Sequence, residues 1–146
     1  MNIRPMTRAD LDAVVALLAD DGLGRGRETP GDPAYADAFA RMEATPGNLY
    51  LVAEQAGHVV GCLQLTMIHG LSRRGASRAQ IEGVRVAANC RGQRIGERLF
   101  EAAFERARGA GCGLVQLTSD KTRQDAHRFY ERLGFVASHT GFKRDL

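Results

Sequence analysis

The strongest constraint on the fold is an apolar run at residues 81–86 that leads into a basic turn and then into a helical pattern. The turn reads Arg91, Gly92, Gln93, Arg94, Ile95 and Gly96. A strand that enters such a turn presents the free N–H groups of the turn and of the first helical residues together, at the positive end of the helix dipole. The sequence therefore predicts a phosphate-binding site at this turn.

The residues after the turn predict a long helix followed by a buried strand. Gly109 and Gly111 are of the type that commonly ends a helix. Residues 114–118 form a short apolar run, which indicates a parallel neighbour when it follows a strand and a helix. The apolar face of the helix is expected to contain Leu99, Phe100, Ala103, Phe104 and Ala107. Together these segments predict a β-α-β unit.

The first part of the chain predicts a strand and two helices. A short strand is expected at residues 2–6. Thr7 and Asp10 have capping-box spacing ahead of an amphipathic helix that reaches about Asp21. Residues 32–44 repeat apolar positions at helical spacing and stop before a proline and a glycine, which indicates a second helix.

Two hairpins are expected outside the β-α-β unit. Residues 49–54 and 59–67 are rich in apolar and β-branched residues and flank a compact polar turn. Near the other end, Thr122 and Asp125 have capping-box spacing ahead of a short helix that stops at a glycine. Two final strands are expected at residues 135–138 and 142–144.

These elements indicate a mixed α/β class in one domain, residues 1–146. We expect a central mixed sheet of about six or seven strands flanked by about four helices. One domain is consistent with the length, since chains of this size bury a single core.

Composition narrows the classes of function. The net charge is +3 and Trp is absent, with aromatic residues at 6%. A basic surface permits an anionic partner, but the scarcity of aromatic stacking platforms and the lack of a recognition helix argue against nucleic acid. The four histidines are scattered and the three cysteines have no paired spacing, so we expect no metal. No apolar run suits a membrane span or a signal peptide, so we expect a cytoplasmic protein.

Three motifs occur in order along the second half of the chain. They read Ile-Glu-Gly-Val-Arg-Val at residues 81–86, Arg-Gly-Gln-Arg-Ile-Gly at 91–96 and Ala-His-Arg-Phe-Tyr-Glu-Arg-Leu-Gly-Phe at 126–135. In this order, on a strand, a strand-turn-helix and a helix-glycine-strand, they resemble the GNAT superfamily of acetyl-CoA-dependent N-acetyltransferases. The expected order of elements extends the resemblance over the whole chain.

The resemblance implies that the turn binds the pyrophosphate of acetyl-CoA. The implied contacts are Arg91, Gly92, Gln93, Arg94, Ile95 and Gly96. The family pattern has glycine where this chain has Arg94, so the chain gains a charge and loses easy access to positive φ. We expect the Arg94 side chain to point away from the turn or onto phosphate. The alternative role for Gly92 and Gly96 is to allow a tight turn and close helix packing.

The resemblance also implies a bulged, splayed strand beside the turn. Free backbone groups of Val84, Arg85 and Val86 would pair with the pantetheine arm, and one N–H would polarise the thioester carbonyl. Gly83 supplies flexibility where a bulge would help; the alternative is an ordinary central strand. Arg123 stands where the family often has an asparagine that contacts the cofactor, and a solvated helix terminus is the alternative there.

Glu82 is the candidate general base. An amine with a pKa of about 10.4 is protonated at neutral pH and must lose a proton before it attacks a thioester. A carboxylate in a partly desolvated cleft has a raised pKa and takes that proton more readily. The alternative is a glutamate on the strand face that pairs with Arg78 or Arg85.

Tyr130 is the candidate general acid, because the family has a tyrosine in this role at the matching position. A phenol with a pKa of about 10 stays protonated at neutral pH and protonates the departing thiolate of coenzyme A. The alternative is a core aromatic residue whose hydroxyl is bonded to the backbone.

The resulting expectation is transfer of an acetyl group from acetyl-CoA to a primary amine of a small molecule or peptide, by direct attack in a ternary complex. The alternative is a non-catalytic acyl-CoA-binding regulatory module. The sequence does not identify the acceptor; Asp120, Lys121 and the basic loop at residues 72–78 are candidates to face it. A homodimer through the apolar edge of the terminal hairpin is a further hypothesis.

Overall fold

The computed structural model describes residues 1–146 and contains one five-stranded sheet in the order β1-β2-β3-β4-β5. The strands are β1 (Asn2–Pro5), β2 (Asn48–Gln55), β3 (His58–Ile68), β4 (Ser77–Val86) and β5 (Cys112–Gln116). The helices are α1 (Leu11–Ala19), α2 (Ala34–Glu43), the single turn α3 (Ser72–Gly75), α4 (Ile95–Gly109) and α5 (Gln124–Arg132). Neighbouring strands are antiparallel except β4 and β5, which are parallel, as the β-α-β prediction requires.

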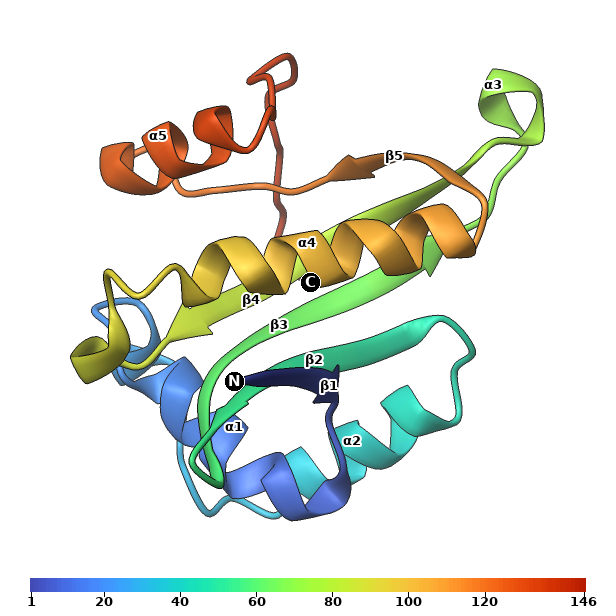
Figure 1. Cartoon of the computed structure of the whole chain (residues 1–146). Coiled ribbons are helices and arrows are strands. Elements are labelled where there is room, and N and C mark those ends of the chain that lie inside the picture. The colour runs from blue at the N-terminus through green and yellow to red at the C-terminus, as the bar shows by residue number, and fades with distance from the viewer.

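The sheet is covered unequally on its two faces. Figure 1 shows α4 lying across one face, where it joins β4 to β5. The main core forms between this helix and the sheet, with Leu63, Leu65, Ile81, Leu99 and Phe100 almost fully buried. A smaller core on the other face brings Val14 of α1 against Val52 and Cys62. Because apolar residues alternate along β2 and β3, these two strands supply side chains to both layers.

The prediction of six or seven strands is wrong, because the structure has five. The expected strands at residues 135–138 and 142–144 do not form. Within residues 135–146 only Phe135 and Ser138 donate backbone hydrogen bonds to backbone, and both bonds are local. Val136 and Phe142 are 81% and 92% exposed. A short hairpin with no packed face is marginal in water, which accounts for the missing strands. The hairpin edge through which a homodimer was expected is therefore not formed in the single chain.

The second predicted capping box is also wrong. Thr122 directs both its N–H and its hydroxyl to Asp120 Oδ1, at 2.9 and 2.6 Å, instead of capping α5 with Asp125. Arg123 is the residue before the helix.

None of the helices has the length and apolar composition that crossing a membrane would require.

The first capping box does form and is part of a buried charge network. The Thr7 N–H donates to Asp10 Oδ2 at 2.8 Å, and Arg4 donates to both oxygens of Asp10 at 2.8 and 2.9 Å. Arg4 also bonds Glu54 on β2. The Arg4 hydrogen bonds hold the pKa of Asp10 well below its usual range. This network ties β1 to the start of α1.

We expect Asp10→Asn to lower the free energy of unfolding at pH 7 by about 1.5–3 kcal/mol, because it removes charged hydrogen bonds from a buried group. A depressed native pKa stabilises the fold above the unfolded pKa, about 3.9, and this contribution is lost as the pH falls below it. Urea unfolding at pH 7 and pH 3 should therefore show a smaller difference between wild type and variant at pH 3. An equal difference at both pH values would contradict the assignment.

Candidate active site

Strand β4 carries a bulge at the point where the sequence predicted one. Cys62 of β3 pairs with Arg85, whereas Gln64, two residues further along, pairs with Glu82, so β4 has one extra residue in this interval. Gly83 lies in the bulge with φ of +59°. A β-carbon there would lie 3.1 Å from the Tyr50 hydroxyl, so both the positive φ and the limited space favour glycine at this position. The bulge re-aims the strand that leads to the turn.

Beyond Gln80 the strands β4 and β5 separate. Their last paired residues are Gln80 and Gln116, so the β5 side of residues 81–86 has no strand partner. The Ser119 hydroxyl, just beyond β5, is buried and has no hydrogen-bond partner in the chain. A gap with unpaired backbone on one side and an unsatisfied buried hydroxyl on the other suits an extended polar ligand.

The turn before α4 exposes a continuous set of backbone donors. No N–H group from Gly92 to Glu97 donates to a protein acceptor. These six groups precede or open a fifteen-residue helix, whose dipole is positive at this end. Arg94 adopts the left-handed conformation, with φ of +61°, that glycine would adopt. Its Nε donates to Glu97 Oε2 at 2.7 Å, so the side chain points along the helix and the turn keeps its free donors.

Helix α5 is held against the start of α4 by close packing. A β-carbon at Gly96 would lie 3.2 Å from the Phe129 ring, so glycine allows the two helices to approach. The fully buried Phe100 is central to an aromatic cluster, with centroid distances of 5.7 Å to Phe129, 5.8 Å to Tyr130 and 5.9 Å to Phe135. This cluster connects the turn to Tyr130 through packed side chains.

The Tyr130 side chain combines a packed ring with an unpaired hydroxyl. The ring belongs to the aromatic cluster, as the core interpretation expected, but the hydroxyl forms no hydrogen bond within the chain. Burial raises the pKa of Tyr130, and the charges of Arg123 and Arg85 act in the opposite direction. The phenol is therefore protonated at neutral pH and lies within the field of two cations, where a developing thiolate would be stabilised.

Glu82 is exposed on β4 and forms no ion pair with Arg78 or Arg85. Instead the Arg85 Nε lies 2.8 Å from Asp21 Oδ2, although its N–H is not aligned for a hydrogen bond. Arg85 also donates from Nη1 to the Val84 carbonyl at 2.9 Å. The ion-pair alternative for Glu82 is thus absent, and its carboxylate is available at the bulge.

Comparison with known proteins agrees with this geometry. The model of the acetyltransferase (GNAT) family matches residues 12–135. The chain belongs to the GNAT acetyltransferase family. Over 99% of its length it is 35% identical to aminoalkylphosphonate N-acetyltransferase of Salmonella typhimurium, 90% of which is covered. Over 92% it is 31% identical to glucosamine 6-phosphate N-acetyltransferase 1 of Oryza sativa subsp. japonica, with 80% of that protein covered.

A solved structure from Bacillus halodurans, described as a transcriptional regulator, is 47% identical to this chain. It superposes with a TM-score of 0.95, and 99% of each chain is covered. Because the family model covers most of the chain and the two aligned relatives above are named N-acetyltransferases, this chain is an N-acetyltransferase of the family.

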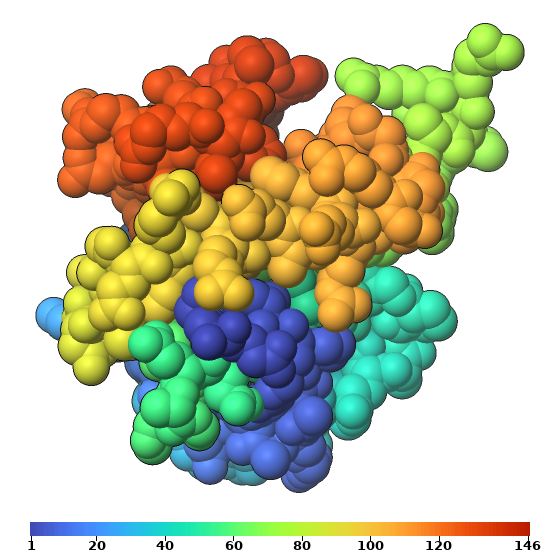
Figure 2. Space-filling model, in the orientation of Figure 1, coloured from blue at the N-terminus to red at the C-terminus, as the bar shows by residue number.

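Several predicted site residues of the acetyltransferase come together and others do not. Tyr130, Arg123 and Arg85 are close enough for their charges to interact. The turn residues 91–94 are exposed and border the free donors. Asp120 accepts two hydrogen bonds from Thr122 in the loop before α5, and these bonds lower the pKa of Asp120. Of the basic loop predicted at residues 72–78, residues 72–75 form the turn α3, which Figure 2 shows standing out from the body, apart from α5, whereas Arg78 lies in β4.

Tyr50 is a site residue that the sequence did not indicate. It lies among the apolar residues of β2, where an aromatic residue is typical of any strand. Only the cross-strand register places its hydroxyl over Gly83, two strands away. Ser119 was missed for the same reason, because its burial depends on how β5 ends.

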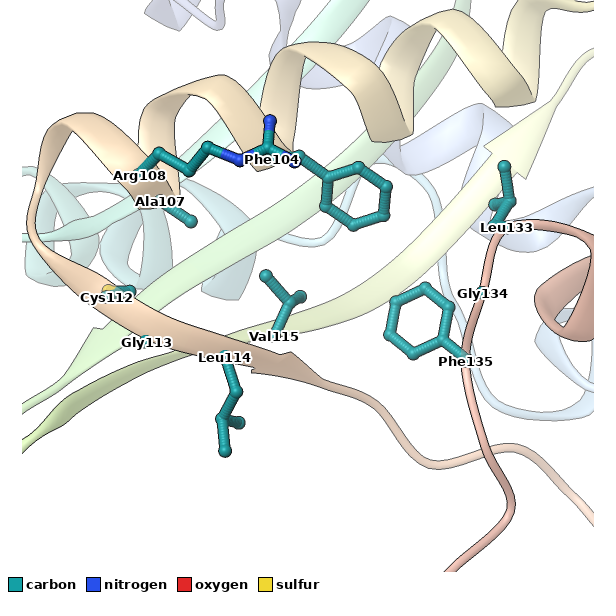
Figure 3. Close-up of a pocket in the computed structure, with 10 residues that line it drawn as sticks. All are labelled: Phe104, Ala107, Arg108, Cys112, Gly113, Leu114, Val115, Leu133, Gly134 and Phe135. Atoms are coloured by element: carbon teal, nitrogen blue, oxygen red, sulfur yellow. The ribbon is translucent and has the colours of Figure 1, made fainter. Parts of the chain in front are cut away.

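The apolar cavity of the acetyltransferase does not coincide with this site. It measures about 290 Å³ and lies along the outer edge of β5, against the second half of α4. Figure 3 shows Phe104, Val115 and Phe135 pointing towards the shared space, whereas Leu114 points to the opposite side of the strand. Its lining includes neither the bulge nor the turn, so we do not assign it to the acetyl-transfer chemistry.

Proposed function

We propose that the chain transfers the acetyl group of acetyl-CoA to a primary amine of a small molecule, by direct attack in a ternary complex. The observation that carries the proposal is the continuity of three features. The bulged and unpaired end of β4 leads directly into the free N–H groups at residues 92–97, and Tyr130 adjoins Phe129, whose ring packs on Gly96 of that turn. An extended thioester with a pyrophosphate at one end matches this order of features.

In the proposed arrangement the turn binds the pyrophosphate through the backbone of Gly92 to Gly96, with Arg91 and Gln93 beside it. Val84, Arg85 and Val86 pair with the pantetheine arm through their unpaired backbone. Arg123 lies near the thiol end, because its charge acts on the Tyr130 hydroxyl. Rigid binding of this kind supplies much of the rate by fixing the thioester relative to the acceptor.

The proposed reaction forms one bond and breaks one. Glu82 takes a proton from the acceptor ammonium group, directly or through water, and the neutral nitrogen attacks the carbonyl carbon of the thioester. A backbone N–H of the bulge donates to the developing oxyanion. The C–N bond forms, the C–S bond breaks, and the sulfur receives the proton of the Tyr130 hydroxyl, while the nitrogen loses its second proton, which returns through water to the Tyr130 phenolate. The products are the N-acetylated acceptor and coenzyme A.

Release of free thiol from acetyl-CoA, followed with a panel of primary amines, tests this function. We expect Glu82→Gln to lower kcat/KM by about a hundredfold at pH 7, because general-base assistance is lost. The loss should shrink as the pH approaches the pKa of the amine, since more acceptor is then already neutral. Glu105→Gln, an exposed carboxylate on α4, is the matched control. A pH-independent effect of Glu82→Gln, or none, would exclude Glu82 as the base.

A further inference from the structure

The sheet face opposite α4 is polar over β3, β4 and β5. Residues that pair across neighbouring strands share a face. The register places Tyr50, Gln64 and Glu82 in one row, and the next row contains Asn48, Thr66, Gln80 and Gln116. A third row contains Ile68, Arg78 and Leu114. A strip of partly exposed polar side chains therefore runs from the bulge towards the start of β4.

This polar strip retains unused hydrogen-bonding capacity. Gln64 Nε2 donates to Asn48 Oδ1 at 3.0 Å, and Gln116 Nε2 donates to Gln80 Oε1 at 2.9 Å. These bonds fix the orientation of the amides. They leave the Gln64 and Gln116 carbonyl oxygens and the Gln80 amide nitrogen with no protein partner. Oriented amides with free donors and acceptors form a suitable surface for a polar ligand.

The bulge end of the strip is acidic. Glu82 lies there without an ion-pair partner, and the Tyr50 hydroxyl lies over Gly83. Glu28 approaches from the loop after α1, and its Oε1 accepts a hydrogen bond from the Tyr35 hydroxyl at 3.3 Å. Burial raises the pKa of Tyr50; the charges of Glu82 and Glu28 add to the effect, whereas the charge of Arg85, which is paired with Asp21, opposes it. Two carboxylates beside a buried phenol favour a cation.

The opposite end of the strip is basic. Arg78 is half-buried on the same face as Gln80 and Glu82, and its guanidinium forms no ion pair or side-chain hydrogen bond in the chain. Arginine without a partner at the end of an amide row is suited to a carboxylate, phosphate or phosphonate, which it binds through paired N–H donors. Four residues of strand separate the α-carbons of Arg78 and Glu82 by about 13 Å, and the arginine side chain shortens this gap.

We propose that this strip is the acceptor site and that the acceptor is a small primary amine carrying a phosphonate or phosphate group. Its ammonium group lies between Glu28, Tyr50 and Glu82, and its acidic group lies against Arg78. Glu28 and Tyr50 position the nitrogen that Glu82 deprotonates. This inference rests on the proposed function and adds the residues that recognise the acceptor. The names of the two relatives aligned above, an aminoalkylphosphonate and a glucosamine 6-phosphate acetyltransferase, agree with it.

The test compares 2-aminoethylphosphonate with propylamine as acceptors at saturating acetyl-CoA. We expect wild type to have the higher kcat/KM for the phosphonate. Arg78→Gln should raise KM for the phosphonate about tenfold, the size expected for a lost charged hydrogen bond, and leave KM for propylamine unchanged. Glu28→Gln should raise KM for both. Arg74→Asn removes an equal charge from the exposed turn α3, where φ is +60° and asparagine is tolerated, and should change neither.

An equal change of both KM values in Arg78→Gln, or no wild-type preference for the phosphonate, overturns the acceptor assignment while acetyl transfer stands. Absence of thiol release with every amine overturns the proposed function instead. In that case calorimetry of 2-aminoethylphosphonate with the full chain and coenzyme A still decides the inference. Weaker binding to Arg78→Gln than to wild type supports the assignment, and absent or equal binding refutes it.

Discussion

Replacing Tyr130 by phenylalanine is expected to lower kcat by about a hundredfold or more, the range for loss of a general acid. The dissociation constant of acetyl-CoA should stay at its wild-type value, because the ring remains in the aromatic cluster and only the unpaired hydroxyl is removed. Steady-state kinetics and equilibrium binding measure the two quantities separately. A split between them identifies an interaction made in the transition state.

The pH profile gives an independent check on Tyr130. An acid acts while it is protonated, and burial raises the pKa of this phenol above its usual value of 10.0. The wild-type kcat should therefore persist to a more alkaline pH than an ordinary tyrosine would allow. In Tyr130→Phe the alkaline decline that belongs to this group should disappear. Equal losses in kcat and in acetyl-CoA affinity would instead make Tyr130 a binding or structural residue.

Phe100→Ala is expected to cost about 3–5 kcal/mol of unfolding free energy, because it leaves a cavity in a fully packed site. That is a large share of the about 5–15 kcal/mol available to a domain. Phe100 is completely buried and contacts four aromatic rings, at Phe104, Phe129, Tyr130 and Phe135. Activity should fall as well, since α5 loses the side chain that fixes it to α4.

Phe142→Ala is the matched control for this prediction. Phe142 is 92% exposed, so truncation of the same side chain should change stability by no more than about 0.5 kcal/mol. Chemical denaturation of both variants, with acetyl-CoA binding measured on the folded protein, makes the comparison. Similar stability of the two variants would show that the aromatic cluster does not anchor α5.

The turn before α4 could be predicted closely because its determinants are local. A strand, a glycine and a helix start follow one another within residues 81–96, so the free N–H groups arise from consecutive residues. The orientation of the Arg94 side chain, at a position where the family pattern has glycine, could also be predicted in part. The sequence predicted that the side chain would point away or onto phosphate, and the structure pairs it with Glu97 three residues later.

The end of the chain shows where local patterns mislead. Residues 135–144 contain apolar residues around a glycine and resemble a hairpin, yet in the structure they pair neither with each other nor with the open edge of β5. Alternation of residue types records a preference for extended backbone but not the presence of a partner. The extra strands were predicted from the preference alone.

The sequence by itself determined the order of elements as far as α5, the β-α-β unit and the donor-rich turn, because each is specified by neighbouring residues. Only the tertiary structure decided what surrounds them. The register of three strands sets Tyr50 over Gly83, and the loop after α1 brings Asp21 to Arg85. The same register gathers Glu82, Gln80 and Arg78 into one strip with residues of β2, β3 and β5. These contacts join residues distant in the chain, so packing between strands and not local spacing determines them.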